Sequence, residues 1–186
     1  MAAQPSEAFS PATRAWFTGA FAKPTPAQLG AWEAIDRGDD TLVVAPTGSG
    51  KTLAAFLHSI DRLMRSPIPA DRQRRCRVLY ISPMKALAVD VDRNLRSPLV
   101  GIEREAQRLG LETSEVLVGI RTGDTPASER ARFARRPPDI LITTPESLYL
   151  LLTSQQRELL TSIETVIVDE IHQMVATKRG AHLFLS

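Results

Sequence analysis

Short apolar runs separated by helical patterns limit the folds open to this chain more than any other sequence feature. Five runs are rich in Val, Ile and Leu and mostly lack alternation, which is typical of strands buried on both faces. They cover residues 41–44, 78–82, 115–118, 140–143 and 165–168. Between the first two, apolar residues recur at helical spacing from Leu53 to Met64. Strands that alternate with helices predict an α/β fold, with a parallel sheet flanked by helices.

Polar residues and prolines predict where these elements begin. Thr125 and Thr144 each precede a proline and are predicted to cap helices, and Thr153 with Gln156 fits a capping box. Residues 66–77 contain two prolines and a cluster of arginines, so we expect a surface loop there. A short helix is expected over residues 14–21, inside a proline-rich lead-in formed by residues 1–25.

The composition is that of an ordinary globular protein, with 43% hydrophobic and 24% charged residues and a net charge of +2. Cys76 is the only cysteine, which excludes an internal disulfide or a cysteine metal cluster and favours a reducing, cytoplasmic setting. No apolar run is long enough to span a bilayer. All but four of the 23 basic residues are arginines. Phosphate recognition and a general arginine preference explain this excess equally well.

The segment Ala45-Pro46-Thr47-Gly48-Ser49-Gly50-Lys51-Thr52 follows a predicted strand and opens a predicted helix. Glycines allow backbone N–H groups to curl around phosphate oxygens, and a helix N-terminus favours negative charge. Lys51 would reach the β- and γ-phosphates of a nucleotide, and Thr52 would hold Mg²⁺. Ala45 departs from the pattern, which has glycine there. The alternative is a glycine-rich turn without a ligand, which the intact Gly-Lys-Thr makes much less favourable.

Two acids, Asp169 and Glu170, follow the run at residues 165–168. The first suits a Mg²⁺ ligand beside a phosphate loop, and the second suits activation of an attacking water. Two acids after a strand often form only a solvated turn, so this interpretation depends on the phosphate-loop pattern as well.

Together these segments resemble the conserved motifs of superfamily 2 helicases. Residues 47–52 and 169–172 are similar to motifs I and II, residues 24–28 to the Q motif, and residues 82–87 to motif Ia. Residues 121–124 and 143–147 resemble the later motifs that contact single strands. The run at residues 178–182 is similar to the Lhr (large helicase-related) family. Met84 and Ala176 depart from this pattern, which has leucine and glycine there.

The resemblance implies roles for individual residues. Gln28 would read the adenine edge, although a surface glutamine on a helix would look the same in the sequence. The residues implied to contact nucleic acid are Ser82, Lys85, Arg121, Thr122, Thr144 and Ser147. Taken singly, each is better explained as a solvated loop residue or a helix cap. His172 would couple the nucleotide to another lobe, or it is a buried imidazole with a satisfied hydrogen bond.

The resemblance further implies an ATP-binding RecA-like lobe over residues 26–186 that stops before motif III, with a second lobe expected downstream. The implied function is an ATP-dependent, Mg²⁺-requiring helicase or translocase on single-stranded DNA or RNA. The second lobe would supply an arginine finger, so the chain alone is expected to be inactive or slow. The alternative is a module that binds ATP and nucleic acid without turnover. A GTPase is excluded because no Asn-Lys-x-Asp segment is present. A gap is expected between the strands at residues 41–44 and 165–168.

Overall fold

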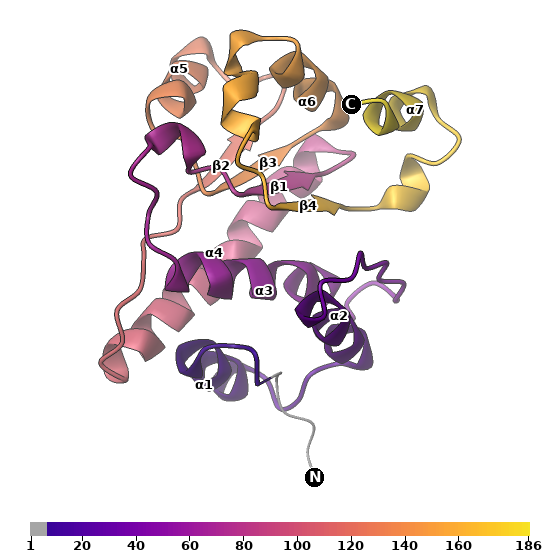
Figure 1. Cartoon of the computed structure of the whole chain (residues 1–186). Helices are drawn as coiled ribbons and strands as arrows, with labels where there is room; N and C mark the ends of the chain where they lie inside the picture. Colours follow the sequence, from indigo (N-terminus) through magenta and orange to yellow (C-terminus); the bar gives the residue numbers. More distant parts are fainter. Residues whose placement is uncertain (1–6) are drawn as a thin grey trace. The chain divides into compact units, whose positions relative to one another are not determined.

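The computed structural model describes residues 7–186, and these form two compact units. Unit 1 contains the described residues up to Pro67 together with Leu95–Glu115. Unit 2 contains Ile68–Asn94 and Val116–Ser186. Figure 1 shows the chain coloured along its sequence, with each helix and strand labelled. Residues 1–6 of the expected lead-in lie outside the described residues.

Unit 1 is built from helices α1 (Pro11–Ala20), α2 (Pro26–Asp36) and α3 (Lys51–Arg65), with the later part of α4 (Lys85–Arg108). The short helix expected near residue 14 is confirmed, although it begins earlier. It starts at Pro11 because the Ser10 hydroxyl accepts a hydrogen bond from the N–H of Thr13. Prolines also occupy the first turn of α1 and α2, where an N–H group would have no acceptor within the helix.

Aromatic side chains form the core of unit 1. The Trp32 ring meets Phe9 and Phe17 edge-on, at centroid distances of 5.1 and 5.4 Å. The indole N–H of Trp32 donates to the carbonyl of Ala54 at 3.1 Å, which ties α2 to α3. The apolar stripe predicted on α3 is confirmed, because the residues from Phe56 to Met64 at helical spacing are buried.

Unit 2 contains a four-stranded parallel sheet of β1 (Val78–Ile81), β2 (Val118–Arg121), β3 (Ile140–Thr143) and β4 (Thr165–Val168). The strand order is β2-β3-β1-β4. Helices α5 (Ala127–Arg135), α6 (Pro145–Leu152) and α7 (Lys178–Phe184) belong to this unit. Three short 3-10 helices complete it: η1 (Arg72–Arg74), η2 (Gln155–Leu160) and η3 (Ile171–Gln173). The predicted α/β class with a parallel sheet flanked by helices is confirmed.

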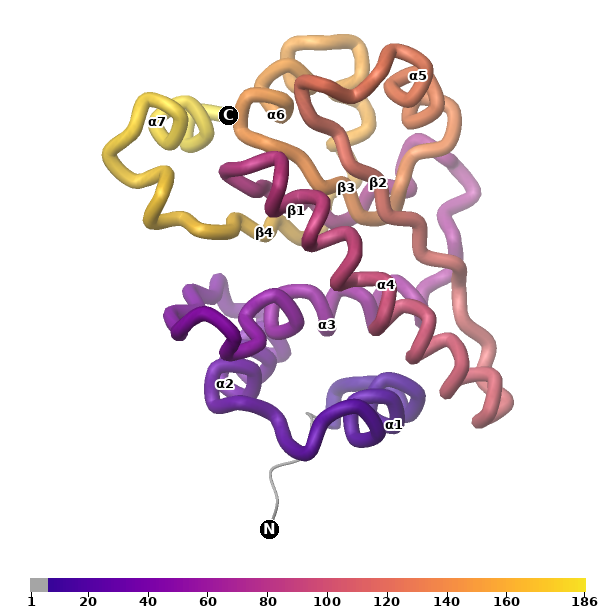
Figure 2. Tube along the Cα trace, turned by 180° about the vertical axis from the view of Figure 1, so that it is seen from behind, coloured from indigo at the N-terminus to yellow at the C-terminus, as the bar shows by residue number. Residues whose placement is uncertain are grey.

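One face of this sheet packs against α6 and α7. Leu79 and Ile81 of β1 lie in one apolar cluster with Leu148 of α6 and Leu183 of α7. Figures 1 and 2 both show α6 and α7 side by side. The sheet therefore fixes the positions of both helices relative to the strand ends.

Two of the five predicted strands are placed wrongly. Residues 41–44 form no strand, and Leu42 and Val44 are 73% and 84% exposed. None of the described residues pairs with this run as a neighbouring strand. A strand without a hydrogen-bonded neighbour is not stable in water, so the apolar run does not adopt strand structure. The strand expected at residues 115–118 begins instead at Val118, because a side-chain carboxylate, that of Asp139, takes the N–H of Leu117 at 2.8 Å.

The helix caps predicted from the sequence are only partly confirmed. Thr144 is the N-cap of α6 and a proline follows it, but its hydroxyl does not cap the helix. Thr125 lies outside α5 and accepts the N–H of Thr122 at 2.9 Å. The predicted capping box at Thr153 is wrong, because η2 begins at Gln155 and its cap is Ser154. Hydroxyl side chains have several local backbone partners, and sequence spacing does not select among them.

The loop expected at residues 66–77 is not a surface loop throughout. Arg75 and Arg77 are buried and pair with the buried carboxylate of Asp139, at 2.9 and 3.4 Å. Cys76 lies between them and is fully buried. This ion network joins the segment before β1 to the start of β3.

Strand β4 lies at an edge of the sheet. It pairs with β1, and within residues 7–186 no second strand joins its other side. Val166 is 56% exposed. The expected gap lay between β4 and a strand at residues 41–44, but those residues do not form a strand.

Candidate functional site

In unit 1 the predicted phosphate loop forms a turn directly before α3. Gly48 and Gly50 both have φ of +81°, a left-handed conformation that favours glycine. The ammonium group of Lys51 donates to the carbonyls of Ala45 and Pro46 at 2.6 and 3.0 Å. The first N–H groups of a helix lack intrahelical acceptors, so the start of α3 presents donors suited to an anion.

The Thr25–Gln28 pair contacts this loop from the start of α2. The two residues form a reciprocal capping box, in which the N–H of Thr25 donates to Oε1 of Gln28 at 2.9 Å. The Thr25 hydroxyl donates to the carbonyl of Ser49 at 2.9 Å, and Nε2 of Gln28 donates to that of Gly50 at 3.4 Å. Gln28 is 4% exposed, so its interpretation as a surface glutamine is wrong.

Gly50 is constrained a second time by this contact. A Cβ atom at position 50 would lie 2.4 Å from Nε2 of Gln28. The Gln28 amide keeps one further N–H and one further lone pair, which are the groups that reading an adenine edge requires.

In unit 2 the predicted strand-contacting residues gather at one edge of the sheet. Ile81, Thr143 and Val168 stand in register across three strands, and Arg121 is in register with Thr143. The residues that follow these strand ends therefore lie in one row. They are Ser82, Thr122, Thr144 and Asp169. Ligands of parallel α/β sheets bind at this carboxyl edge.

Three of the predicted hydroxyls, those of Ser82, Thr144 and Ser147, already have partners inside the molecule. The buried hydroxyl of Ser82 donates to the carbonyl of Met84 at 3.0 Å. The Thr144 hydroxyl donates to that of Ser147 at 3.2 Å, and both residues are buried. The structure thus brings the predicted hydroxyls to one edge, but presents them as parts of an internal network.

The two cations near the row differ in burial. Arg121 is buried and hydrogen-bonds to Gln156, and burial together with the charge of Arg130 lowers its pKa. Lys85 lies at the start of α4 and pairs with Asp124 on the surface. Lys85 is therefore the more accessible of the two cations.

The two acids follow β4 and differ in their contacts. One Asp169 oxygen accepts the hydroxyl of Tyr80, and the other accepts the N–H of Glu170 at 2.9 Å. Burial, the hydrogen bond to Asp169 and the charges of both acids raise the pKa of Tyr80. Glu170 has φ of +49°, which is strained for a residue other than glycine. His172 pairs with Glu170 at 3.2 Å and its side chain is 73% exposed, so the buried-imidazole interpretation is wrong.

Sequence reasoning missed Tyr80, Glu146 and Arg179. Tyr80 is one apolar-run residue among several, and nothing in the run shows which member faces Asp169. Arg179 forms a two-pronged ion pair with Glu146 and also donates to the carbonyl of Pro83 at 2.7 Å. Both residues stood inside runs that resembled helicase motifs, but their spacing of 33 residues hid the contact.

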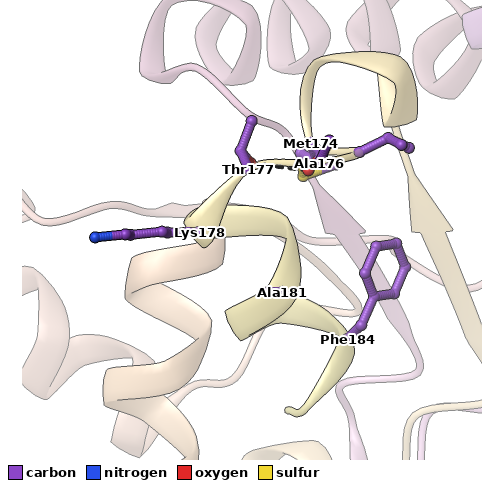
Figure 3. Close-up of a pocket in the computed structure, with 7 residues that line it drawn as sticks. Met174, Ala176, Thr177, Lys178, Ala181 and Phe184 are labelled. Carbon is purple, nitrogen blue, oxygen red and sulfur yellow. Dashed lines mark hydrogen bonds between the residues drawn. The ribbon is translucent and has the colours of Figure 1, made fainter.

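A small apolar hollow lies between η3 and α7 (Figure 3). Its volume is about 440 Å³, and its lining includes Val175, Ala176, Ala181 and Phe184. Ala176 has φ of +62°, which explains why the family pattern has glycine there. Lys178 is the only charged residue that lines the hollow. Because one charged group alone forms no binding or catalytic constellation, we assign the hollow no chemical role.

Residues 25–185 match the family model described as DEAD/DEAH box helicase. The chain belongs to the DEAD/DEAH box helicase family. It is 62% identical over 185 residues to the Lhr helicase/probable uracil glycosylase of Mycolicibacterium smegmatis, and 56% identical over 184 residues to the Lhr helicase/uracil glycosylase of Escherichia coli. These matches cover 99% and 97% of the chain but only 12% of each relative. The resemblance to the Lhr helicases is therefore confirmed.

A solved structure agrees with this family. The structure of Mycobacterium smegmatis helicase Lhr bound to ssDNA and AMP-PNP has a TM-score of 0.91 and 61% identity to this chain. The match covers 98% of the chain and 23% of that structure's chain. The DUF1998 helicase MrfA, at 21% identity and a TM-score of 0.72, shares the fold. In residues 7–186, no helix has the length and apolar character needed to cross a membrane.

Two side chains that were predicted to bind Mg²⁺ carry oxygen atoms. The hydroxyl of Thr52 and the carboxylate of Asp169 are hard oxygen donors of the kind that Mg²⁺ prefers. No cluster of three or more His, Cys, Asp or Glu suited to a metal occurs among the described residues. Mg²⁺ is usually held by one or two protein oxygens together with substrate phosphates and waters.

Proposed function

We propose that this chain is the ATP-binding lobe of an ATP-dependent helicase or translocase that moves on single-stranded DNA or RNA. In this proposal residues 26–186 form the first RecA-like domain, and residues 1–25 lead into the Q motif. The row of polar residues along the carboxyl edge of the parallel sheet is the observation that carries the proposal. A phosphate loop alone would fit any P-loop ATPase, whereas this row offers contacts for a nucleic-acid backbone as well.

ATP would bind at the phosphate loop of unit 1. Lys51 would bind the β- and γ-phosphates, and the turn of residues 47–50 with the start of α3 would supply backbone N–H groups. Gln28 would orient the adenine through its remaining donor and acceptor. Thr52 and Asp169 would hold Mg²⁺, which neutralises phosphate charge when it is bound. Glu170 would take a proton from the attacking water.

Nucleic acid would bind along the carboxyl edge of the sheet in unit 2. Short hydroxyls and cations suit phosphate oxygens, which give affinity without base specificity. The candidates remain those that the family pattern indicates, namely Ser82, Lys85, Arg121, Thr122, Thr144 and Ser147. Lys85 would exchange partners most readily, because its ion pair with Asp124 is exposed and exposed pairs are weak.

Turnover would require more than this chain. Phosphoryl transfer gains about 10³–10⁵ in rate from an arginine finger. We place that arginine in a second RecA-like lobe, since the chain covers only 12% of its Lhr relatives. The cytoplasm, where ATP and nucleic acid are both available, is the proposed compartment. The alternative function is a module that binds ATP and nucleic acid without hydrolysis.

One experiment separates the two functions. ATP turnover is measured with and without single-stranded DNA or RNA, for this chain and for the full-length protein that contains it. We expect strand-stimulated turnover in the full-length protein and little or none in this chain. A full-length protein that binds both ligands without hydrolysing ATP would establish the binding module instead.

A salt titration of strand binding by this chain gives a second check. Few phosphate contacts should give weak binding that falls with salt along a shallow slope. Salt-insensitive or tight base-specific binding would contradict a phosphate-contacting row.

A further inference from the structure

Arg179 makes three hydrogen bonds to two separate segments of unit 2. Its Nε and Nη2 atoms bind the two carboxylate oxygens of Glu146, the latter at 3.2 Å. The same Nη2 donates to the carbonyl of Pro83 at 2.7 Å. Arg179 lies in α7, Glu146 in the first turn of α6, and Pro83 directly after β1. One guanidinium therefore joins three pieces of chain that are far apart in sequence.

These contacts use the shape of arginine as well as its charge. A planar guanidinium offers a fork that matches both oxygens of a carboxylate, whereas a lysine ammonium acts as a point charge. The hydrogen bond from Arg179 lowers the pKa of Glu146, which agrees with a pair that stays ionised. Because the pair is about half exposed, its contribution to overall stability should be small.

The two segments that Arg179 joins carry the candidate strand-binding residues. Pro83 stands between Ser82 and Lys85 in sequence, and Glu146 stands between Thr144 and Ser147. Shifts of either segment would move two of these residues at once.

The arginine itself belongs to the segment that follows the two acids. Asp169 and Glu170 lead through η3 into α7. The start of α7 packs closely against the residue that follows η3, since a Cβ atom at Gly180 would lie 1.9 Å from the carbonyl of Met174. The Thr177 hydroxyl both donates to that carbonyl and accepts the N–H of Gly180. These contacts hold the start of α7, which carries Arg179, against the residue that follows η3.

We infer that Arg179 is a positioning residue that aligns the Ser82–Lys85 and Thr144–Ser147 segments for strand binding and links them to the acids after β4. This inference rests on the proposed function and adds the means by which strand binding and ATP turnover are coupled. Arg179 acts through the backbone of Pro83 and the carboxylate of Glu146.

Two simpler roles predict different outcomes. If Arg179 bound a strand phosphate directly, lysine would replace it well, because lysine also binds phosphate. If the pair were only surface charge, neutralising Glu146 would strengthen binding of a polyanion. A positioning role predicts weaker strand binding from both changes, including the one that removes a negative charge.

The test uses the full-length protein with Arg179→Lys and Glu146→Gln. Arg157→Lys and Glu158→Gln are matched controls, since both residues are exposed on η2 and no side-chain contact of theirs is described. ATP turnover is measured against the concentration of single-stranded DNA, together with turnover without DNA and the melting temperature. We expect both test variants to raise the DNA concentration for half-maximal stimulation about tenfold, as changes in supporting residues commonly do. Turnover without DNA and the melting temperature should stay near those of the controls.

Three results would overturn the inference. The first is tighter DNA binding by Glu146→Gln, and the second is an unchanged response to DNA in Arg179→Lys. The third is a parallel fall of turnover with and without DNA, which would indicate a general structural role. A parent protein that neither single-stranded DNA nor single-stranded RNA stimulates would instead refute the proposed function, and the two failures are therefore distinguishable.

Discussion

Unit 1 holds its helices together through aromatic rings and short-range caps, whereas unit 2 holds its strands together through a backbone ladder and a buried ion network. In unit 1 the rings of Phe9, Phe17 and Trp32 pack edge-on. In unit 2, β1 pairs with β4, whose residues lie more than 80 positions further along the chain. Contacts between residues far apart in sequence require more loop closure and form more slowly during folding. We therefore expect the two units to respond differently to the same kind of change.

The chain contains separate reporters for the two units. Both tryptophans, Trp16 and Trp32, lie in unit 1, and the single cysteine, Cys76, lies in unit 2. Burial, with a smaller effect of the Asp139 charge, raises the pKa of Cys76 to about 12. The thiol should therefore react with alkylating reagents only after unit 2 opens. Tryptophan fluorescence and thiol reactivity can follow the two units independently.

The largest expected effect comes from Lys51→Ala in unit 1. Loss of the phosphate-binding ammonium should lower ATP turnover of the full-length protein by about 10²–10³-fold, the usual cost of one charge-stabilising donor. Lys23→Ala removes the same charge at an exposed site and should have little effect. In this chain, fluorescence and thiol reactivity should remain those of the parent. Unchanged ATP affinity and turnover would show that the loop is not a nucleotide site.

Glu170→Gln tests the catalytic part of unit 2. The change keeps size and removes the basic carboxylate, so the full-length protein should bind ATP and nucleic acid but hydrolyse at least about 10²-fold more slowly. Turnover measured beside binding of a fluorescent ATP analogue checks this. Turnover at the parental rate would assign the water-activating role to another residue.

Asp139→Ala should separate the stabilities of the two units. It leaves Arg75 and Arg77 buried without their carboxylate, and breaking such a pair costs about 3–5 kcal/mol. Cys76 should become reactive at lower denaturant concentration, while the tryptophan transition moves less.

Asp61→Ala is the reciprocal variant in unit 1. Asp61 is buried and accepts the N–H of Ser10 and the hydroxyl of Thr13. Its loss should move the tryptophan transition first. If both reporters shifted together in both variants, the two units would unfold as one, and their stabilities would not be separate.

The smallest expected effect is a gain from Ala176→Gly. A left-handed conformation costs a residue other than glycine about 1–2 kcal/mol, and the greater chain entropy of glycine offsets part of this. We expect unit 2 to gain about 0.5–1 kcal/mol, measured through Cys76 reactivity in denaturant. Ala181→Gly, inside α7, should have the opposite sign. A loss of stability in Ala176→Gly would mean that position 176 is not left-handed in solution.

The sequence was most informative where structure depends on nearby residues. The phosphate-loop turn and the stripe on α3 both depend on residues only a few positions apart. Three apolar runs also became strands at the expected places. Burial on both faces requires an unbroken apolar pattern and accounts for β1 and β3, whereas β4 is only partly buried.

The rest depended on partners that a local pattern does not identify. Residues 41–44 have strand composition but no described ladder partner. The arginines at positions 75 and 77 read as surface charge until Asp139, more than 60 residues away, is placed between them. Tyr80 and Arg179 were missed for the same reason, since each acquires its role from a residue at least 33 positions distant.

The open side of β4 has a consequence for handling this chain by itself. An edge strand presents unpaired N–H and C=O groups that can template pairing with another molecule. Natural proteins often protect such edges with a lysine, and here the exposed side chain at the second position of the strand is Val166. Two copies of the chain can therefore extend each other's sheets, so its self-association should grow with concentration.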